Sequence, residues 1–176
     1  MTIVAYYKDT LFADSMSVIP TDTHQQISFR DKLHISPCRR IAYVKAGIII
    51  QSEVQKELFG QLVGVFAENL PGNGLCFKAD GYLMKSCMES SIVMLKDSTW
   101  RYNSDTEMFH RLGSEEIFSH GTGSSVFEMS LALGTTGEVA MKNAIQYAPL
   151  CGGPILTVKR STLKPFKFIK DKKDVK

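Results

Sequence analysis

The sequence predicts a single-domain α+β protein built in layers, and three observations support this prediction. Short β-branched and aromatic runs lie at 2–7 and 10–14 on either side of a polar break. Apolar residues recur every three or four positions over 51–66, which is typical of a helix with one buried face. Two further helical patterns, at 124–133 and 138–148, follow each other with no strand between them. Because strands and helices do not alternate regularly, a layered α+β fold is favoured over a doubly wound one.

The first two strands are predicted to form a hairpin around Lys8 and Asp9. A two-residue break between apolar runs is typical of such a turn, although Lys-Asp is a weaker signal than Asn-Gly. Residues 15–26 are polar, contain Pro20 and lack a period, so we expect a loop there. Short strands are then expected at 27–29, 32–35 and 41–45.

The first helix is predicted over 51–66 and is followed by a Pro-Gly-Asn-Gly stop at 71–74. Its expected core face carries Val54, Leu58, Leu62, Val65 and Phe66. Ile48–Ile50 before it and Phe59, Val63 and Phe66 along it give more apolar surface than one core face requires. This excess predicts contact with another subunit, and the alternative is a helix that is covered on both faces.

The second half of the chain is predicted to add two hairpin strands, two helices and a closing strand. Residues 75–88 fit no single pattern, and a short helix is one interpretation. Ser124 is expected to cap the helix that follows the turn at 121–123. The remaining strands are expected at 91–95, 100–102, 117–120 and 155–158.

Composition excludes several classes of protein. Of the 176 residues, 44% are hydrophobic and 22% are charged, which fits one globular domain over 1–163. The net charge of +3 is too small to predict nucleic-acid binding, and the lysines of the tail at 164–176 are expected to form a solvated terminus rather than a basic contact surface. No apolar run approaches the roughly 20 residues that span a bilayer, and Lys45 interrupts the longest candidate. Without a signal-peptide pattern, we expect a cytoplasmic protein that binds no membrane.

Cysteines and histidines show no spacing typical of a metal site. We therefore expect no metal and no cofactor, and we expect the four cysteines to be buried thiols rather than disulfides. These residues are Cys38, Cys76, Cys87, Cys151, His24, His34, His110 and His120.

Thr2 would become the terminal residue if Met1 were removed, as is usual when the second residue is small. A terminal threonine carries a hydroxyl nucleophile and an α-amine, and this amine titrates near ~7.7–8.0, so it can act as the base for its own hydroxyl. Many chains begin with Met-Thr, and the alternative is a threonine without a chemical role.

The order of several short motifs resembles that of proteasome β subunits, and most closely that of the HslV peptidases among the N-terminal-nucleophile (Ntn) hydrolases. The resemblance runs from residue 2 to about residue 160. The matching residues are Thr2-Ile3-Val4, Asp14, Lys32, Gly47, the turn Gly121-Thr122-Gly123-Ser124 and the segment Cys151-Gly152-Gly153-Pro154-Ile155.

This resemblance implies a four-layer αββα sandwich and a threonine peptidase site. Thr2 would be the nucleophile and base, Asp14 and Lys32 would tune its proton transfer, and Gly47 would donate an N–H to the oxyanion. Thr122 takes the place of the serine in the family's Gly-Ser-Gly turn. Peptide or unfolded-protein substrates, a homo-oligomer such as a ring, and an unfoldase or other proteasome-like partner are also implied.

The chemistry of a lysine beside the nucleophile is sound, because its positive charge stabilises an alkoxide and keeps the amine neutral. Asp14 would hold Lys32 in place and keep it charged. The alternative for these two residues is an ordinary surface ion pair.

Two departures from the family pattern favour a second hypothesis, in which the chain is an inactive proteasome-like assembly or interaction module. Aligning Thr2 with the family's second threonine places Met1 on the nucleophile. The family's acidic residue before the closing strand is missing, since Val139 to Lys170 contains no Asp or Glu.

Two other segments are candidates for separate sites. The turn at 121–124 could hold an anion at a helix start, although a tight turn is the commoner reason for two glycines. Cys151 could be a reactive thiol, although no base is identifiable beside it and a buried structural cysteine is the alternative.

Overall fold

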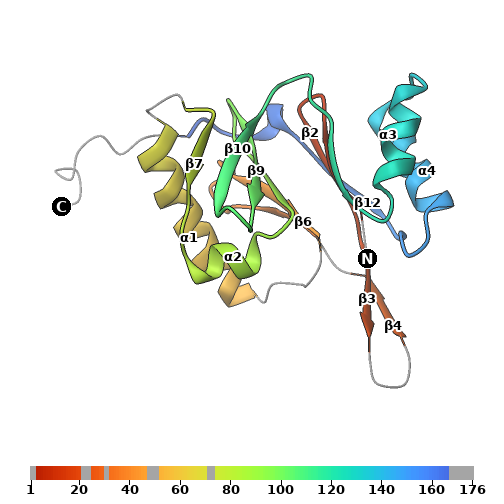
Figure 1. Ribbon diagram of the computed structural model, residues 1–176, viewed down its shortest axis with the longest axis horizontal. Coiled ribbons are helices and arrows are strands. Elements are labelled where there is room, and N and C mark those ends of the chain that lie inside the picture. The colour runs from red at the N-terminus through yellow and green to blue at the C-terminus, as the bar shows by residue number, and fades with distance from the viewer. Residues whose placement is uncertain (1–2, 21–24, 30–31, 47–51, 71–73, 167–176) are drawn as a thin grey trace.

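The computed structural model describes residues 3–20, 25–29, 32–46, 52–70 and 74–166. Its elements form four layers, which Figure 1 shows from left to right as two helices, a large sheet, a small sheet and a second pair of helices. The helices are α1 (Ser52–Asn69), α2 (Tyr82–Cys87), α3 (Ser124–Ala132) and α4 (Gly137–Tyr147). The αββα sandwich predicted from the sequence is confirmed.

The small sheet contains strands from the beginning of the sequence and from its last quarter. It has the order β11-β1-β2-β12, and all neighbours are antiparallel. Its strands are β1 (Ile3–Tyr7), β2 (Thr10–Asp14), β11 (Phe118–Gly121) and β12 (Ile155–Lys159). The first hairpin is therefore the centre of this sheet, because both of its outer edges are paired.

The turn of this hairpin is built without glycine. Lys8 and Asp9 have φ angles of 42° and 59°, the left-handed values that a two-residue hairpin turn requires. Such values are unfavourable for a residue with a Cβ, although Asp tolerates them better than most. The tertiary contacts of Asp9 described below explain why the turn keeps an aspartate there.

The large sheet has the order β5-β6-β8-β9-β10-β7. Its strands are β5 (Leu33–Ile35), β6 (Ala42–Lys45), β7 (Cys76–Lys78), β8 (Ser91–Met94), β9 (Thr99–Asn103) and β10 (Met108–Leu112). The sequence did not predict β10, because His110 and Arg111 interrupt its apolar pattern. Phe109 alone is fully buried there, and the strand is held by its ladders to β9 and β7.

The loop expected at 15–26 is wrong, because strands β3 (Met16–Pro20) and β4 (Gln25–Phe29) form a hairpin there. Figure 1 shows this hairpin projecting from the end of the sandwich. Strands pair through their backbones, so a polar composition does not prevent the ladder. Pro20 ends β3, which is an edge strand of this two-stranded sheet, and edge strands tolerate a proline.

The helix starts differ from the prediction in one place. Gly123, not Ser124, is the N-cap residue of α3, and the helix start has no side-chain cap. Phe127 N donates to Gly123 O at 3.0 Å, which places Ser124 in the first turn. Helix α4 does have a side-chain cap, since Thr136 accepts a hydrogen bond from Val139 N at 3.3 Å.

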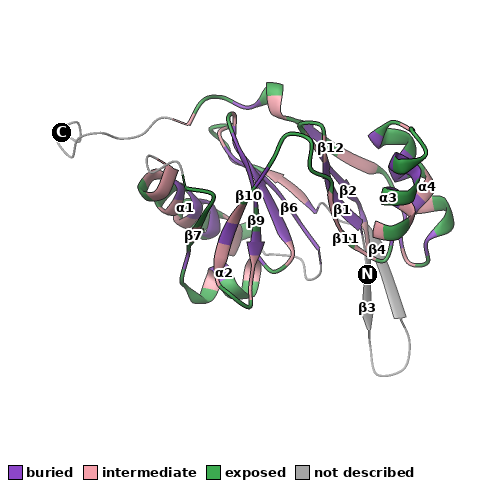
Figure 2. Cartoon of the chain, turned by 45° about the horizontal axis from the view of Figure 1, so that its top comes forward, coloured by how far each residue is buried: buried purple, intermediate pink, exposed green. Residues whose placement is uncertain are grey.

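Among the described residues, three apolar clusters fill the three spaces between the four layers. Figure 2 shows the buried residues concentrated on the facing sides of sheets and helices. The cluster under α1 and α2 includes Tyr43, Leu58, Phe66, Trp100 and Phe109. The cluster between the sheets includes Val4, Tyr6, Val44, Ile92 and Met94. The cluster under α3 and α4 includes Ile3, Phe12, Phe127, Met141 and Ala144.

The excess apolar surface expected on α1 is mostly absent. Phe59 is only 8% exposed and Phe66 is fully buried, and only Val63 stays exposed, at 38%. The helix buries both phenylalanines because the large sheet and α2 together cover a wide stripe of it. The described part of α1 therefore gives no support to an oligomer, and Ile48–Ile50, which also carried this expectation, lie outside the described residues.

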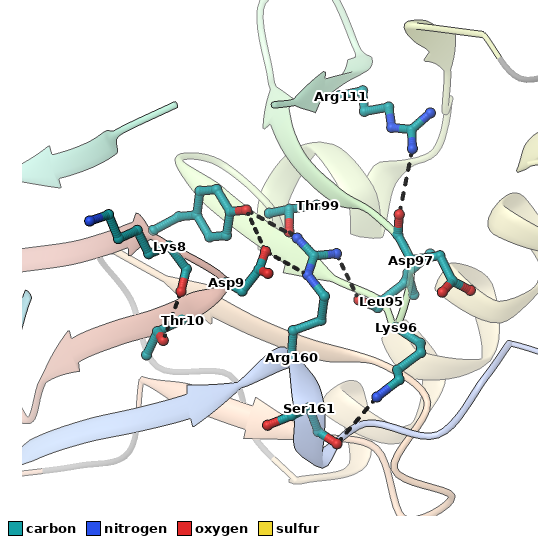
Figure 3. A network of polar contacts seen from close by, with 11 residues as sticks. Lys8, Asp9, Thr10, Leu95, Lys96, Asp97, Thr99, Arg111, Arg160 and Ser161 are labelled. Carbon is teal, nitrogen blue, oxygen red and sulfur yellow. Dashed lines mark hydrogen bonds and ion pairs between the residues drawn. The ribbon is translucent and has the colours of Figure 1, made fainter. Parts of the chain in front are cut away.

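Arg160 ties the two sheets together at the end of the sandwich where the first hairpin turns (Figure 3). On the small sheet, its Nε donates to Asp9 Oδ1 at 2.8 Å and its Nη2 to Tyr6 Oη at 3.0 Å. On the large sheet, the guanidinium donates to Leu95 O at 3.2 Å and to Thr99 Oγ1 at 2.8 Å. We call this end of the sandwich the clamped end.

Within the described residues, no helix is both long enough and apolar enough to cross a membrane. Of the basic tail expected at 164–176, the structure describes only the first three residues, and 167–176 lie outside the described part.

Candidate active site

The predicted pair of Asp14 and Lys32 is brought together at the end of the sandwich opposite the clamped end. Lys32 Nζ lies 2.7 Å from Asp14 Oδ1. The lysine also donates to Met16 O, two residues beyond the aspartate. The side chains are 3% and 0% exposed, respectively. The surface ion pair that we considered as the alternative is therefore excluded.

The Asp14 carboxylate also accepts two backbone N–H groups. Ile3 N donates to Oδ1 at 3.0 Å, and Gly152 N donates to Oδ2 at 3.1 Å. Met16 N completes the arrangement by donating to Gly152 O at 3.1 Å. One buried carboxylate thus joins the start of β1, the end of β2, the segment before β12 and Lys32.

This environment changes the pKa of Lys32 through two opposing effects. Burial lowers the pKa of Lys32 below its ordinary value of 10.5, and the hydrogen bond and negative charge of Asp14 oppose this effect. A lysine in such a position is held rigidly and gives up its proton more readily than a surface lysine. Perturbed titratable groups of this kind are frequent at functional sites.

Thr122 is an exposed residue of the turn that follows β11, beside this centre. Its Oγ1 is 3.4 Å from Cys151 Sγ, and the preceding Gly121 pairs with Ile3 across β1 and β11. Thr122 is therefore close in space to the segment that holds Asp14, as the resemblance implied.

The backbone conformation explains the first glycine of this turn, and close packing explains the second. Gly121 has a φ of 112°, in the region that favours glycine. A Cβ at Gly123 would lie 3.0 Å from Cys151 Sγ, 3.1 Å from Ile3 Cβ and 3.2 Å from Ala144 Cβ. A tight turn thus explains the motif without a bound anion.

Cys151 is buried, and burial raises the pKa of its thiol. This matches the structural cysteine that we gave as the alternative to a reactive thiol. The cysteines are free in the structure, as expected, but the expectation that all are buried is wrong. Cys38 and Cys76 are exposed, because they lie on a turn and on an edge strand.

Two predicted site residues, Thr2 and Gly47, lie outside the described residues. Of the residues next to them in the sequence, the structure describes Ile3, whose N–H donates to Asp14, and Ala46, which directly follows β6. Lys45 N donates to Lys32 O at 3.0 Å, so the strand that leads toward position 47 is fixed beside the buried lysine.

Sequence reasoning missed the backbone donors Ile3 N–H and Gly152 N–H, because amide groups carry no side-chain signature. It also missed that Lys45 is buried, at 7% exposure. The signal for Lys45 was present, because a charged residue stood within the longest apolar run. No group of three or more metal-ligating side chains occurs in the part of the chain that the structure describes.

Comparison with solved structures identifies the fold. Eukaryotic HslV from Trypanosoma brucei superposes with a TM-score of 0.57 over 90% of this chain and 98% of its own, at 15% sequence identity. The chain has the fold of an HslV subunit. A protein described as BPH from Thiobacillus denitrificans is also similar, with a TM-score of 0.46 and 8% identity over 89% of this chain and 95% of its own. Compared by sequence, the chain matches no family model and no curated protein.

Proposed function

We propose that this chain is an HslV-like threonine peptidase whose nucleophile is Thr2, exposed by removal of Met1. One observation carries the proposal: a single buried carboxylate, Asp14, holds both the Lys32 ammonium and the N–H of Ile3, the residue that follows Thr2. A buried ion pair at the first residues of a strand has little structural purpose, since a pair of well-packed apolar side chains would stabilise the same two positions at least as well.

The proposed reaction is attack of Thr2 Oγ on a peptide carbonyl. The α-amine accepts the hydroxyl proton and passes it to the leaving amine, and water then hydrolyses the ester formed on Thr2. The Lys32 ammonium stabilises the oxygen anion of the nucleophile, and the N–H of Gly47 donates to the oxyanion of the tetrahedral intermediate. Thr122 offers a hydroxyl to the amine in place of the family's acid.

The test is hydrolysis of small fluorogenic peptides by protein whose intact mass shows that it begins at Thr2. We expect turnover that is lost in Thr2→Ala and in Lys32→Met, and partly kept in Thr2→Ser. Lys78→Met, at an exposed ion pair, is the matched control and should leave turnover unchanged. A folded, Met1-free protein without turnover would overturn the proposal, and so would turnover that survives Thr2→Ala.

The second candidate function is an inactive assembly or interaction module with the same fold. The observation that favours it is the neutral character of the segment before β12, which contributes the Gly152 N–H and the Cys151 thiol near Thr122 but no carboxylate. A hydrogen bond to a charged group is worth about 1.5–3 kcal/mol. Losing it would lower the rate roughly ten- to hundredfold. Retention of Met1 on the mature protein would decide for this candidate.

We also propose that the chain forms a homo-oligomer, such as a ring that works with an unfoldase. Large apolar side chains are exposed on the outer helices, with Met129 at 65% and Leu133 at 80% on or next to α3, and Tyr147 at 67% on α4. Sizing chromatography with light scattering should show an oligomer that Leu133→Glu dissociates. A wild-type monomer at micromolar concentration would contradict this.

A further inference from the structure

A cavity of about 490 Å³ lies at the clamped end of the sandwich, away from the residues of the proposed reaction. Four of the side chains that line it are cationic and one is a carboxylate, so the lining carries a net charge of +3. The net charge of the whole chain is also +3. One cavity thus holds as much excess positive charge as the entire protein. Its lining residues are Lys8, Asp9, Thr10, Lys96, Lys159, Arg160 and Ser161.

The lysines of this cavity come from three segments that the fold holds together. Lys8 belongs to the turn of the first hairpin, and Lys159 ends β12, where it pairs with Thr10 of β2. Lys96 belongs to the turn between β8 and β9 of the large sheet, and its Nζ donates to Ser161 O at 3.3 Å (Figure 3). Both sheets therefore contribute cations to one cavity. Like charges repel each other, so this convergence is unfavourable unless a negative charge is bound there.

The carboxylate in the lining does not neutralise the lysines. Asp9 Oδ1 lies 2.8 Å from Arg160 Nε, so these two charges offset each other. The ion pairs found among the described residues do not involve Lys8, Lys96 or Lys159. Three ammonium groups of the cavity are therefore left without a carboxylate in contact, in the part of the chain that the structure describes.

Few existing contacts would have to be replaced by a bound anion. Lys159 is exposed, and its ammonium forms no hydrogen bond with another described residue. Lys96 uses one of its three N–H groups in the bond described above. The ammonium of Lys8 lies 5.2 Å from the centre of the Tyr7 ring, and Glu115 acts on it at longer range. An exposed cation–π contact of this kind is weak, so an anion can compete with it.

We propose that this cavity binds an oligophosphate chain of about triphosphate length. Lys96 and Lys159 donate to its oxygens from the two sheets, and Lys8 adds positive charge from the hairpin turn. Lysine is a common phosphate ligand, because its ammonium is a mobile point charge with three donors. The volume lies in the range of sites for small organic ligands, which is larger than one phosphate group requires. The hydroxyl residues Thr10 and Ser161 line the same cavity.

A second cavity, of about 480 Å³, adjoins the first and has a different character. Its additional cation, Arg111, donates to Asp97 O at 3.5 Å, and the Asp97 carboxylate balances its charge. Leu75 and Leu112 add apolar surface. The phosphate chain is therefore assigned to the first cavity, and the second offers apolar contacts to a nucleoside attached to that chain. The residues that line both cavities are Asp9, Lys96 and Arg160.

The test is isothermal titration calorimetry of the full chain with sodium tripolyphosphate, in a buffer of low ionic strength without phosphate. We expect one anion per chain. Lys96→Met and Lys159→Met should each raise Kd by roughly threefold to tenfold, because single exposed charge pairs are weak, and the double variant should raise it by roughly tenfold to a hundredfold. Lys142→Met removes an exposed lysine of α4 outside the cavity, and this matched control should keep the wild-type Kd.

Three outcomes would overturn the proposal. The first is an unchanged Kd in the double variant, which would place the anion elsewhere, such as on the lysines of the tail. The second is the absence of binding at about 1 mM tripolyphosphate. The third is tighter binding of hexaglutamate than of tripolyphosphate, which would make the cavity a docking site for an acidic peptide.

Titration with adenosine triphosphate separates the two sources of the phosphate chain. Affinity equal to or lower than that of tripolyphosphate would mean that the phosphate chain alone is recognised. Affinity at least tenfold higher would mean that the second cavity holds the nucleoside. The site is independent of the peptidase proposal, because it lies at the opposite end from Asp14 and Lys32. Thr2→Ala should therefore bind tripolyphosphate like the wild type, whether or not the chain hydrolyses peptides.

Discussion

Arg160 contacts Asp9 twice across 151 residues of sequence, through its side chain and its backbone. Its Nε donates to Asp9 Oδ1 at 2.8 Å, and its N donates to Asp9 O at 2.8 Å. The second bond survives any substitution of the side chain except proline, whereas the first belongs to the clamp that also reaches Tyr6, Leu95 and Thr99. This separation makes the clamp testable by side-chain variants.

Arg160→Met is expected to lower the free energy of unfolding by about 3 kcal/mol, because it removes charge-assisted hydrogen bonds and leaves Leu95 O and Thr99 Oγ1 without a donor. Arg160→Lys should recover only part of the loss, because an ammonium cannot reproduce the planar fork. Urea unfolding followed by circular dichroism measures both. Lys159→Met, at the exposed neighbouring position, should change stability by no more than about 0.5 kcal/mol.

The buried ion pair should show strong energetic coupling. Lys32→Met and Asp14→Asn are each expected to destabilise the fold by about 3–5 kcal/mol, because each leaves a buried partner uncompensated. The double variant should lose less than the sum of the two, by about 1–3 kcal/mol. Additive losses in a urea double-mutant cycle would show that the two side chains do not interact. Lys78→Met, at an exposed pair, should have no measurable effect.

Gly123→Ala is expected to destabilise the protein by about 1–3 kcal/mol, because the new methyl group would meet Cys151 Sγ, Ile3 Cβ and Ala144 Cβ. Gly64→Ala is the matched control, since a Cβ at this position of α1 meets nothing within 4 Å. In a helix, this second change should stabilise by about 0.5–1 kcal/mol. The Tm of both variants, measured by thermal unfolding, tests this prediction. An unchanged Tm in Gly123→Ala would mean that the neighbouring side chains move to make room for the methyl group.

The dependence of stability on pH should report Lys45. Burial lowers its pKa in the folded chain, below the value near 10.5 of an unfolded chain. Between these two values the unfolded chain binds more protons, so the free energy of unfolding rises with pH, by at most about 1.4 kcal/mol per pH unit. Lys45→Met should reduce this alkaline rise but not abolish it, because burial also lowers the pKa of Lys32. Lys56→Met, at an exposed position of α1, should follow the wild type. Parallel curves for wild type and Lys45→Met would contradict the burial effect.

The sequence predicted those elements whose own side chains carry the pattern. The β1–β2 hairpin and α1 were correct because their apolar residues alternate or recur at helical spacing, and both faces of β1 are buried. The β3–β4 hairpin and β10 were missed because backbone pairing, which leaves no mark in composition, forms them. Gly123 replaced Ser124 as a cap because tight packing requires a residue without a Cβ at that point.

In the candidate site, too, side chains could be predicted from the sequence and backbone groups could not. Asp14 and Lys32 were predicted through the order of motifs, and the structure joins them directly. Their backbone partners Ile3 and Gly152 could not be predicted, because any residue type supplies an N–H. The roles of Thr2, Gly47 and Thr122 remain predictions.

The order of the small sheet governs when the site can form during synthesis on the ribosome. Strand β2 leaves the ribosome first with β1, but its other edge waits for β12, whose register runs from Ile155 to Lys159. The second N–H donor of Asp14 comes from Gly152, just before that strand. A nascent chain therefore carries the first hairpin with an unpaired edge until almost the whole chain has emerged, and such non-local pairing is slow. A chain whose synthesis stops before residue 155 lacks β12, so one edge of β2, the strand that ends with Asp14, stays unpaired. Such a chain would bind chaperones instead of folding.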